Sequence, residues 1–448
     1  MDILIFGNER VIQTLHSLQT GQAEQSGKNP ARQNPVENDS FKPSRFNYYQ
    51  PAQSNWLVYN TLYNTLARLT NFEYEKLLGK KYCGKELIKK FFSEGLLVEE
   101  NLNELMLYER WATMQRQIDK PYLSVNITTT LKCNARCYYC YEKGVRHKDL
   151  SDTQIRAVNE FIKSNLREND MLALTWFGGE PLLNAKAFDD ITNFLTSSGV
   201  KFSSYIITNG SLVTKKLVTE KFKRWNVHDV QITLDGIAET YEKRKAYVNQ
   251  RAGIFNRILK KIAIVAESGA TVHIRLNIDR NNMEEIFKLI EILEENFGNV
   301  PEISWYPAFL TEVGSDLTET EKIEFIKKLF SKLKNPTKMN AARRLHSLPK
   351  SVACMRNDPK SITVDVYGNV YTCEHLVGRK EESIGTLNDF DTQTNKNRIE
   401  VALRAECENC VFLPKCMGGC AVNLETDDEP CMIEKYIIQG YLAFMAER

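Results

Sequence analysis

Three cysteines within eight residues constrain this chain more than any other feature. Cys133, Cys137 and Cys140 are spaced C-x3-C-x2-C and follow a β-branched, apolar run over residues 123–130 that predicts a strand. Three thiolates on one tight loop can bind three irons of a cubane and leave the fourth iron open, whereas a closed structural site would use four ligands. A zinc loop and three unlinked core cysteines are the alternatives. The loop is therefore a candidate iron–sulfur site.

Cysteine is abundant elsewhere in the chain and unevenly placed. The 448 residues include eleven cysteines, ten of them from Cys133 onward. The first six residues carry Asp2 and lack the basic region and long apolar core of a signal peptide, so we expect a cytoplasmic protein. In that reducing compartment, clustered cysteines indicate metal binding rather than disulfides.

Bulk composition argues against two classes of partner. Lysine and arginine total 59, aspartate and glutamate total 57, and the net charge is +2. This balance does not favour a nucleic-acid or membrane surface that relies on overall charge. No run approaches the roughly 18 apolar residues of a membrane span. We therefore expect no nucleic-acid partner and no membrane partner.

The region before the loop is predicted to contain a flexible segment, residues 1–43, and a small domain, residues 44–118. Residues 21–43 are rich in Gln, Asn, Gly, Ser and Pro and nearly lack large apolar side chains. The small domain shows a strand pair, two helices and a further strand, which is the α+β order of a winged helix. Its expected elements lie at residues 56–59, 65–69, 70–78, 85–93 and 96–98. A packing domain and a DNA-binding module are the alternatives.

Residues 119–335 alternate strand and helix about six times. Repeated βα units imply an α/β fold in which helices cover a parallel sheet, and ligands bind at the carboxyl ends of such strands. The expected strands are 122–128, 172–177, 203–208, 229–234, 271–278 and 302–308, and the expected helices are 151–168, 217–225, 254–267, 283–296 and 320–333.

Residues 336–448 have a different character. Seven cysteines lie between Cys354 and Cys431, and regular periodicity is weak until a final helix over residues 433–446. We expect metal to replace part of the hydrophobic core in this region.

Glycine and polar residues mark the ends of the expected strands. Gly178 and Gly179 follow the second strand directly, and paired glycines at a strand end let backbone approach a ligand closely. An ordinary tight turn is the alternative. Arg275 and Asn277 share one face of the fifth strand, which is either an exposed face or the inside of a barrel. The third strand ends in Thr208-Asn209-Gly210 and the fourth in Thr233-Leu234-Asp235-Gly236.

Taken together, these motifs resemble those of the radical S-adenosylmethionine (radical SAM) enzymes, with Tyr139 in the aromatic position before the third cysteine. The resemblance covers residues 119–448 and implies a partial (β/α)6 barrel over 119–335. It implies that Glu180 and the glycine pair receive the ammonium end of S-adenosylmethionine, the cosubstrate. The further cofactor-binding positions that it implies are Tyr139, Asn209, Thr233, Asp235, Arg275 and Asn277.

The C-terminal cysteines resemble the SPASM domain that follows many radical SAM cores. The resemblance implies two auxiliary 4Fe–4S clusters, which with the loop cluster makes three. A zinc ribbon would explain residues 407–420 alone. The family's extra cysteine, present in sulfatase-maturating relatives, is missing from residues 355–372, so the fourth ligand of one cluster stays open. One cluster would use Cys354, Cys373 and Cys420, and the other would use Cys407, Cys410, Cys416 and Cys431.

These resemblances predict a maturase of a ribosomally made precursor peptide. Residues 44–118 resemble a leader-peptide-binding domain, in which a peptide adds a strand to the hairpin edge. The product would be a thioether or a carbon–carbon crosslink, with a reductant such as flavodoxin or ferredoxin supplying electrons. Glu374 corresponds to an acid that acts as a base in sulfatase-maturating relatives, and a solvated surface acid is the alternative. The alternative functions are a formylglycine-type maturase and an iron–sulfur electron-transfer or binding protein.

Overall fold

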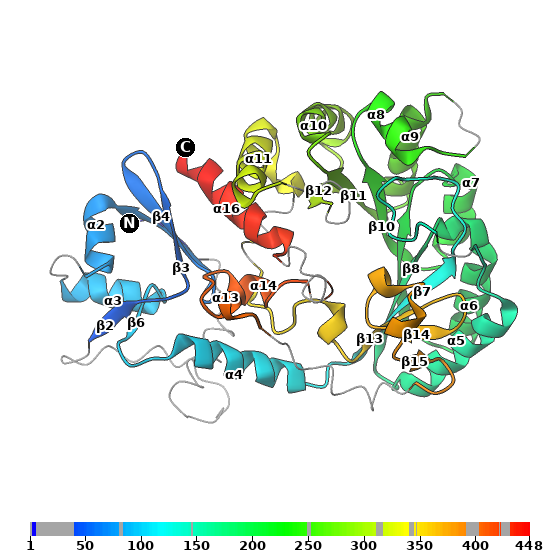
Figure 1. The fold of residues 1–448 in the computed structure, drawn as a ribbon, viewed down its shortest axis with the longest axis horizontal. Coiled ribbons are helices and arrows are strands. Elements are labelled where there is room, and N and C mark those ends of the chain that lie inside the picture. Colours follow the sequence, from blue (N-terminus) through cyan, green and yellow to red (C-terminus); the bar gives the residue numbers. More distant parts are fainter. Residues whose placement is uncertain are drawn as a thin grey trace.

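A computed structural model gives the fold of most of the chain (Figure 1). It describes residues 2–5, 40–79, 84–144, 147–248, 252–310, 317–339, 347–390, 403–420 and 431–448, together with Leu345 and Val422. Most of the segment expected to be flexible, and Cys83, lie outside the described residues.

Six parallel strands form the main sheet, as the βα alternation predicted. Helices cover its outer face, and the fold class is mixed α/β with a parallel sheet (Figure 1). The strands are β7 (Tyr122–Thr130), β8 (Met171–Gly178), β9 (Phe202–Thr208), β10 (Val227–Leu234), β11 (Thr271–Ile278) and β12 (Ile303–Phe309). The helices are α5 (Asp152–Asn165), α6 (Ala185–Ser197), α7 (Lys215–Leu217), α8 (Ala238–Lys245), α9 (Ile254–Ala266), α10 (Met283–Phe297) and α11 (Glu319–Lys332), with a π-turn η2 (Val218–Phe222). Helices α6 and α8 were not predicted.

The two faces of this sheet differ in polarity. The face toward the helices is apolar and fully buried, as at Leu174, Ile206 and Ile274. The opposite face carries polar side chains that bond across neighbouring strands: the hydroxyl of Tyr205 donates to Gln231 Oε1 at 3.1 Å. Because side chains alternate along a strand, the sheet has one packed face and one hydrophilic inner face.

The sheet continues into the cysteine-rich region, which the sequence did not predict. Strand β13 pairs in parallel with β7, and two short antiparallel strands extend the sheet further. These strands are β13 (Ser361–Val364), β14 (Asn369–Tyr371) and β15 (Gly385–Thr386). Cys354 precedes β13, and Cys373 lies between β14 and β15.

The N-terminal region contains the predicted hairpin, the predicted second helix and the predicted capping box at Thr70, whose side chain and that of Glu73 bond reciprocally. Strands β1, β2 and β3 and helix α4 were not predicted, and β1 and β2 lie within residues 1–43, which were expected to be flexible. The four-stranded sheet has the order β1-β5-β4-β3. The elements are β1 (Asp2–Ile5), β2 (Phe41–Pro43), β3 (Asn47–Pro51), β4 (Asn55–Asn60), β5 (Thr65–Thr70), α2 (Asn71–Leu77), α3 (Lys85–Ser93), β6 (Leu97–Glu99) and α4 (Glu104–Gln117).

The helices of the C-terminal region lie between the N-terminal strands and the main sheet (Figure 1). Its helices are α13 (Ala405–Glu408), α14 (Leu413–Cys416) and α16 (Ile433–Ala446), the last as predicted. Helix α16 packs closely on α11, since a Cβ at Gly440 would lie 2.6 Å from Ile326. Within the described residues, no helix is both long enough and apolar enough to cross a membrane.

Candidate active site at the cysteine loop

A cavity of about 200 Å³ opens at the carboxyl ends of the strands, beside the cysteine loop. It brings together most of the residues that the sequence singled out around the loop. Its lining includes Cys137, Tyr139, Cys140, Gly178, Gly179, Thr233, Arg275, Asn277 and Glu374. The predicted residues Glu180, Asn209 and Asp235 are not among its lining residues, and they lie behind it in contacts described below.

The glycine pair is required by the cysteine loop itself. Gly178 has a φ of 123°, and a Cβ there would lie 2.2 Å from the carbonyl oxygen of Thr130. A Cβ on Gly179 would lie 2.3 Å from the carbonyl oxygen of Lys132. The amide of Gly179 donates to Thr130 O at 3.0 Å. The sequence predicted that backbone would approach a ligand closely at the glycine pair. In the structure the glycines instead lie against the backbone that leads into the cysteine loop, and any larger residue at either position would displace that backbone.

Glu180 is fully buried and joins the ends of two strands. Its carboxylate accepts from the Thr208 hydroxyl at 2.7 Å and from the backbone amides of Asn209 at 2.8 Å and Leu182 at 3.2 Å. Burial raises the pKa of Glu180 to about 6, although these donors lower it. These contacts position the ends of β8 and β9, and the ammonium-binding role stays a prediction.

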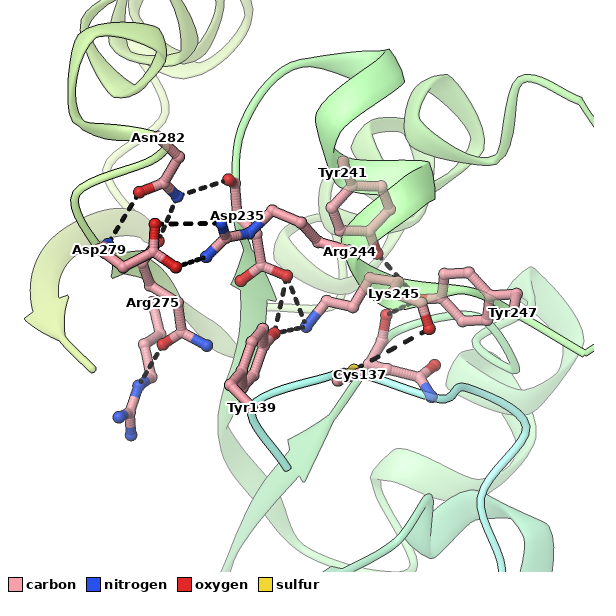
Figure 2. Close-up of polar contacts among 12 residues, drawn as sticks. Cys137, Tyr139, Asp235, Tyr241, Arg244, Lys245, Tyr247, Arg275, Asp279 and Asn282 are labelled. Carbon is pink, nitrogen blue, oxygen red and sulfur yellow. Dashed lines mark hydrogen bonds and ion pairs between the residues drawn. The ribbon is translucent and has the colours of Figure 1, made fainter. Parts of the chain in front are cut away.

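Tyr139, Asp235 and Lys245 form a group behind the loop, in which the aspartate and the lysine are fully buried and the tyrosine is half-buried (Figure 2). The Tyr139 hydroxyl donates to Asp235 Oδ2 at 2.7 Å. Lys245 Nζ lies 3.2 Å from the same oxygen and donates to the tyrosine hydroxyl at 2.8 Å. Although burial alone would lower the pKa of Lys245, the pKa is raised because Asp235 and Cys137 lie nearby. The loop tyrosine is thus held by a buried ion pair.

A second group, also made of a tyrosine, a basic residue and an aspartate, lies beside the first. Arg244 makes two bonds to Asp279, at 3.0 and 3.2 Å, and its guanidinium lies 4.9 Å from the ring centroid of Tyr138. The Tyr138 hydroxyl donates to the same carboxylate. Each group therefore combines a loop tyrosine, a basic residue at the end of α8 and an aspartate that follows a strand. We call the two groups together the tyrosine clamp.

Backbone bonds complete the attachment of α8 to the loop. The amide of Arg136 donates to the carbonyl of Lys245 at 2.9 Å, and the amide of Val248 donates to that of Asn134 at 2.8 Å. Sequence analysis missed Arg244 and Lys245. The only sequence signal was a run of charged residues, Glu242-Lys-Arg-Lys245, which usually indicates a solvated helix face.

Arg275 and Asn277 line the cavity, so the face that they share points inward. The Nε of Arg275 donates to Asn277 Oδ1 at 2.9 Å, and the guanidinium extends away from the tyrosine clamp (Figure 2). A guanidinium held in this way can bind a carboxylate through two parallel hydrogen bonds. The cavity therefore offers an anion-binding group opposite the loop.

Glu374 enters the cavity from the C-terminal region. Its Oε2 accepts from Asn126 Nδ2 on β7 at 3.0 Å, so this side chain is fixed by the barrel and is not a freely solvated surface acid. A second cavity acid, Glu142, was not predicted, and burial raises its pKa to about 7. The ring of Tyr141 stacks on His375 at 4.4 Å. The loop and the segment after Cys373 thus form one wall.

The role of the cysteines as cluster ligands stays a prediction. The ten described cysteines are all free. Burial raises the pKa of Cys133 to about 11, and that of Cys140 and Cys373 to about 12, so these thiols ionise at neutral pH only beside a cation such as iron. Among the described residues, no three Cys, His, Asp or Glu side chains lie close enough together to hold one metal ion. In a cubane each thiolate binds a different iron.

Comparison with known proteins identifies the relatives of this arrangement. Residues 127–293 match the family model described as the Radical SAM superfamily. An uncharacterized protein of Methanocaldococcus jannaschii is 26% identical over 278 residues, which are 61% of this chain and 90% of that protein. The Fe-coproporphyrin III synthase of Methanosarcina barkeri is 26% identical over 204 residues, which are 45% of this chain and 47% of that enzyme.

Two solved structures share the fold at low sequence identity. Native anSMEcpe with bound AdoMet has a TM-score of 0.57 and 17% identity, with 72% of this chain and 96% of that chain covered. Streptococcus suis SuiB bound to its precursor peptide SuiA has a TM-score of 0.50 and 14% identity, with 89% of this chain and all of that chain covered. At these identities the likeness concerns the fold.

Proposed function

The chain carries a radical SAM domain, and we propose that it is a maturase that installs a thioether or a carbon–carbon crosslink in a ribosomally made precursor peptide. The observation that carries the proposal is the single cavity that joins the cysteine loop, the inner face of the barrel and Glu374. Glu374 and His375, which directly follow Cys373, line the same cavity as the loop. The likeness of the fold to SuiB with bound precursor peptide supports a peptide as substrate.

The radical SAM domain implies one 4Fe–4S cluster and S-adenosylmethionine. When bound, they supply a 5′-deoxyadenosyl radical that takes a hydrogen atom from the substrate. Cys133, Cys137 and Cys140 would hold the cluster. Arg275 would bind the carboxylate of the cosubstrate, and Asn277 would orient that guanidinium.

We assign to Glu374 the role of a base in this reaction. It lines the cavity and is oriented by Asn126. A carboxylate so placed can take the proton that leaves the substrate thiol, or the second carbon of a crosslink, while the radical takes the hydrogen atom from the first carbon. The tyrosine clamp keeps the loop in place while the substrate enters.

We assign the seven C-terminal cysteines to two auxiliary clusters, which makes three clusters in all. The first would use Cys354, Cys373 and Cys420, and the second would use Cys407, Cys410, Cys416 and Cys431 in the set expected from the sequence. The position of Glu374 directly after Cys373 brings the first auxiliary site to the cavity wall. Electrons would come from a cytoplasmic flavodoxin or ferredoxin.

Leader docking is assigned to the N-terminal sheet. The precursor's leader would add a strand to the edge of β5, because backbone pairing along a strand edge gives affinity without a preformed pocket. In this structure the chain's own β1 pairs with that edge, from Asp2 opposite Arg68 to Ile5 opposite Thr65. A leader that docks there must therefore replace β1.

The function is tested with anaerobically reconstituted enzyme, a reductant, S-adenosylmethionine and the short peptides encoded beside this gene. We expect release of 5′-deoxyadenosine together with loss of two hydrogen atoms from one peptide. Release that persists after Cys133, Cys137 and Cys140 are all changed to Ala would contradict the assignment of the loop. A formylglycine product in a sulfatase peptide would favour the sulfatase-maturating alternative, and no release at all would favour an electron-transfer protein.

A further inference from the structure

The N-terminal domain packs on the cysteine-rich region, and the two share their hydrophobic cores. One shared cluster joins Tyr108 and Trp111 of α4 to Leu413 and Met417, with Cys407 packed against it. A second joins the hairpin to α16 and Phe412, with Cys410 packed against it. Figure 1 shows the same arrangement, with α13, α14 and α16 beside the N-terminal strands and α4. Cysteines assigned to the second auxiliary cluster thus lie at the contact between the two regions.

Hydrogen bonds cross the same contact close to these cysteines. The Tyr108 hydroxyl donates to the carbonyl of Lys350 at 2.7 Å and lies 2.8 Å from Met417 Sδ. Thr61 donates to the carbonyl of Val411, between Cys410 and Cys416. The contact is therefore specific as well as apolar.

Lys415 stands at the centre of this contact. It precedes Cys416, and only 2% of it is exposed. Its ammonium group donates to Asn64 Oδ1 at 2.8 Å, to the carbonyl of Leu345 at 3.4 Å and to the carbonyl of Ser347. Asn64, with a φ of 62°, forms the turn between β4 and β5. The residue beside a cluster cysteine thus holds the tip of the docking hairpin.

Among these contacts of Lys415, none is with a negatively charged group that could balance its positive charge. Within the described part of the chain, no carboxylate pairs with its ammonium, and its acceptors are neutral oxygens. Burial of a cation is costly unless an anion compensates it. A cubane bound by four thiolates is an anion. A cluster held through Cys416 would place that negative charge next to Lys415.

We propose that the N-terminal hairpin, Lys415 and the second auxiliary cluster form one structural unit, in which the cluster orders the edge that receives the peptide. The inference rests on the proposed function for the docking of a peptide, and on the cysteine assignment for the cluster. By linkage, anything that stabilises the ordered hairpin then stabilises the cluster, and the reverse holds equally. The N-terminal domain then has two roles: it encloses one side of the cluster site, and it binds the peptide.

The test compares amide hydrogen exchange of the full-length reconstituted protein with that of Cys407→Ser/Cys410→Ser. We expect the variant to lose the iron of one cluster and its amides over residues 55–70 to exchange at least tenfold faster. The amides of β8 to β11 should be unchanged, which also shows that the variant is folded. Unchanged exchange over 55–70 despite the iron loss would overturn the proposal.

Lys415→Met supplies a second variant with intact cysteines, and Lys338→Met is its matched control. Lys338 is also a buried lysine that donates to backbone carbonyls, at Val300 and Ile303, away from the hairpin. We expect faster exchange over 55–70 and reduced iron only in Lys415→Met. Equal behaviour of the two variants would contradict the role of Lys415. If the hairpin depends on the cluster but the enzyme binds no peptide, the proposed function fails and the structural unit stands.

Discussion

At the scale of single residues, the tyrosine clamp is the part of the site whose energetics follow most directly from its contacts. Lys245 and Asp235 are buried side chains, 4% and 0% exposed, in a mutual ion pair. Removing one member of such a pair leaves an uncompensated charge, which costs more than the pair contributes.

Lys245→Met should therefore destabilise the domain by about 3–5 kcal/mol, because Asp235 is left buried and unpaired. The double variant Lys245→Met/Asp235→Asn should recover most of that loss. Both are measured by denaturant unfolding, with Lys260→Met on the exposed face of α9 as the control. Equal stabilities for the single and double variants would contradict a charge-based role.

Glu180 gives a prediction about pH. Its folded-state pKa, about 6, lies above its ordinary value of 4.5, so the folded state binds this proton more tightly than the unfolded state does. The contribution of this group to stability is therefore greatest below pH 4.5 and falls as pH rises to about 6, by about 2 kcal/mol. Glu180→Gln lacks this titrating group, so the difference in unfolding free energy between wild type and variant should change by about 2 kcal/mol between pH 4.5 and pH 6. A pH-independent difference would show that the folded-state pKa is not raised.

At the scale of elements, β1 is the segment with the clearest functional consequence. It occupies the edge of β5 where the leader is proposed to pair. Ile3→Pro removes a backbone donor from β1 and should weaken its pairing with β5.

We expect the proline variant to bind the leader about tenfold more tightly, since the leader no longer competes with a paired strand. Titration of a labelled leader measures this affinity. Gln13→Pro, outside β1, is the control and should leave the affinity unchanged. Weaker leader binding in Ile3→Pro would show that β1 assists docking.

At the scale of the whole molecule, the N-terminal domain cannot be treated as a removable module. Its apolar residues pack against Leu413, Phe412 and α16, so removal of residues 1–118 would expose those surfaces to water. We expect the truncated protein to aggregate and to lose auxiliary-cluster iron. A soluble truncated protein with full iron content would contradict the shared core.

Iron content tests the cluster assignment. Ten cysteines in three sets predict about twelve irons per reconstituted chain. Changing Cys133, Cys137 and Cys140 together to Ala should remove about four of them and leave the rest. Zinc at the C-terminal cysteines, with only about four irons bound, would refute the auxiliary clusters.

The sequence by itself determined the barrel strands, the hairpin, the helix over Lys85–Ser93 and the final helix, because each depends on local periodicity and caps. It also placed the cysteine loop and most of the cavity lining, since βα order brings strand ends to one edge. Only the tertiary structure decided which charges are buried. Lys245 and Lys415 look like solvated lysines in the sequence, and their acceptors lie on distant segments.

Contacts between segments far apart in the chain also explain why the sequence did not predict three pairings that the structure shows. The pairing of β13 with β7, of β1 with β5, and of the N-terminal domain with the cysteine-rich region joins segments far apart in the chain. A local sequence pattern indicates that a segment forms a strand or a helix, but it does not indicate which segment it packs against. That pairing is decided by the burial of complementary surfaces in the folded chain.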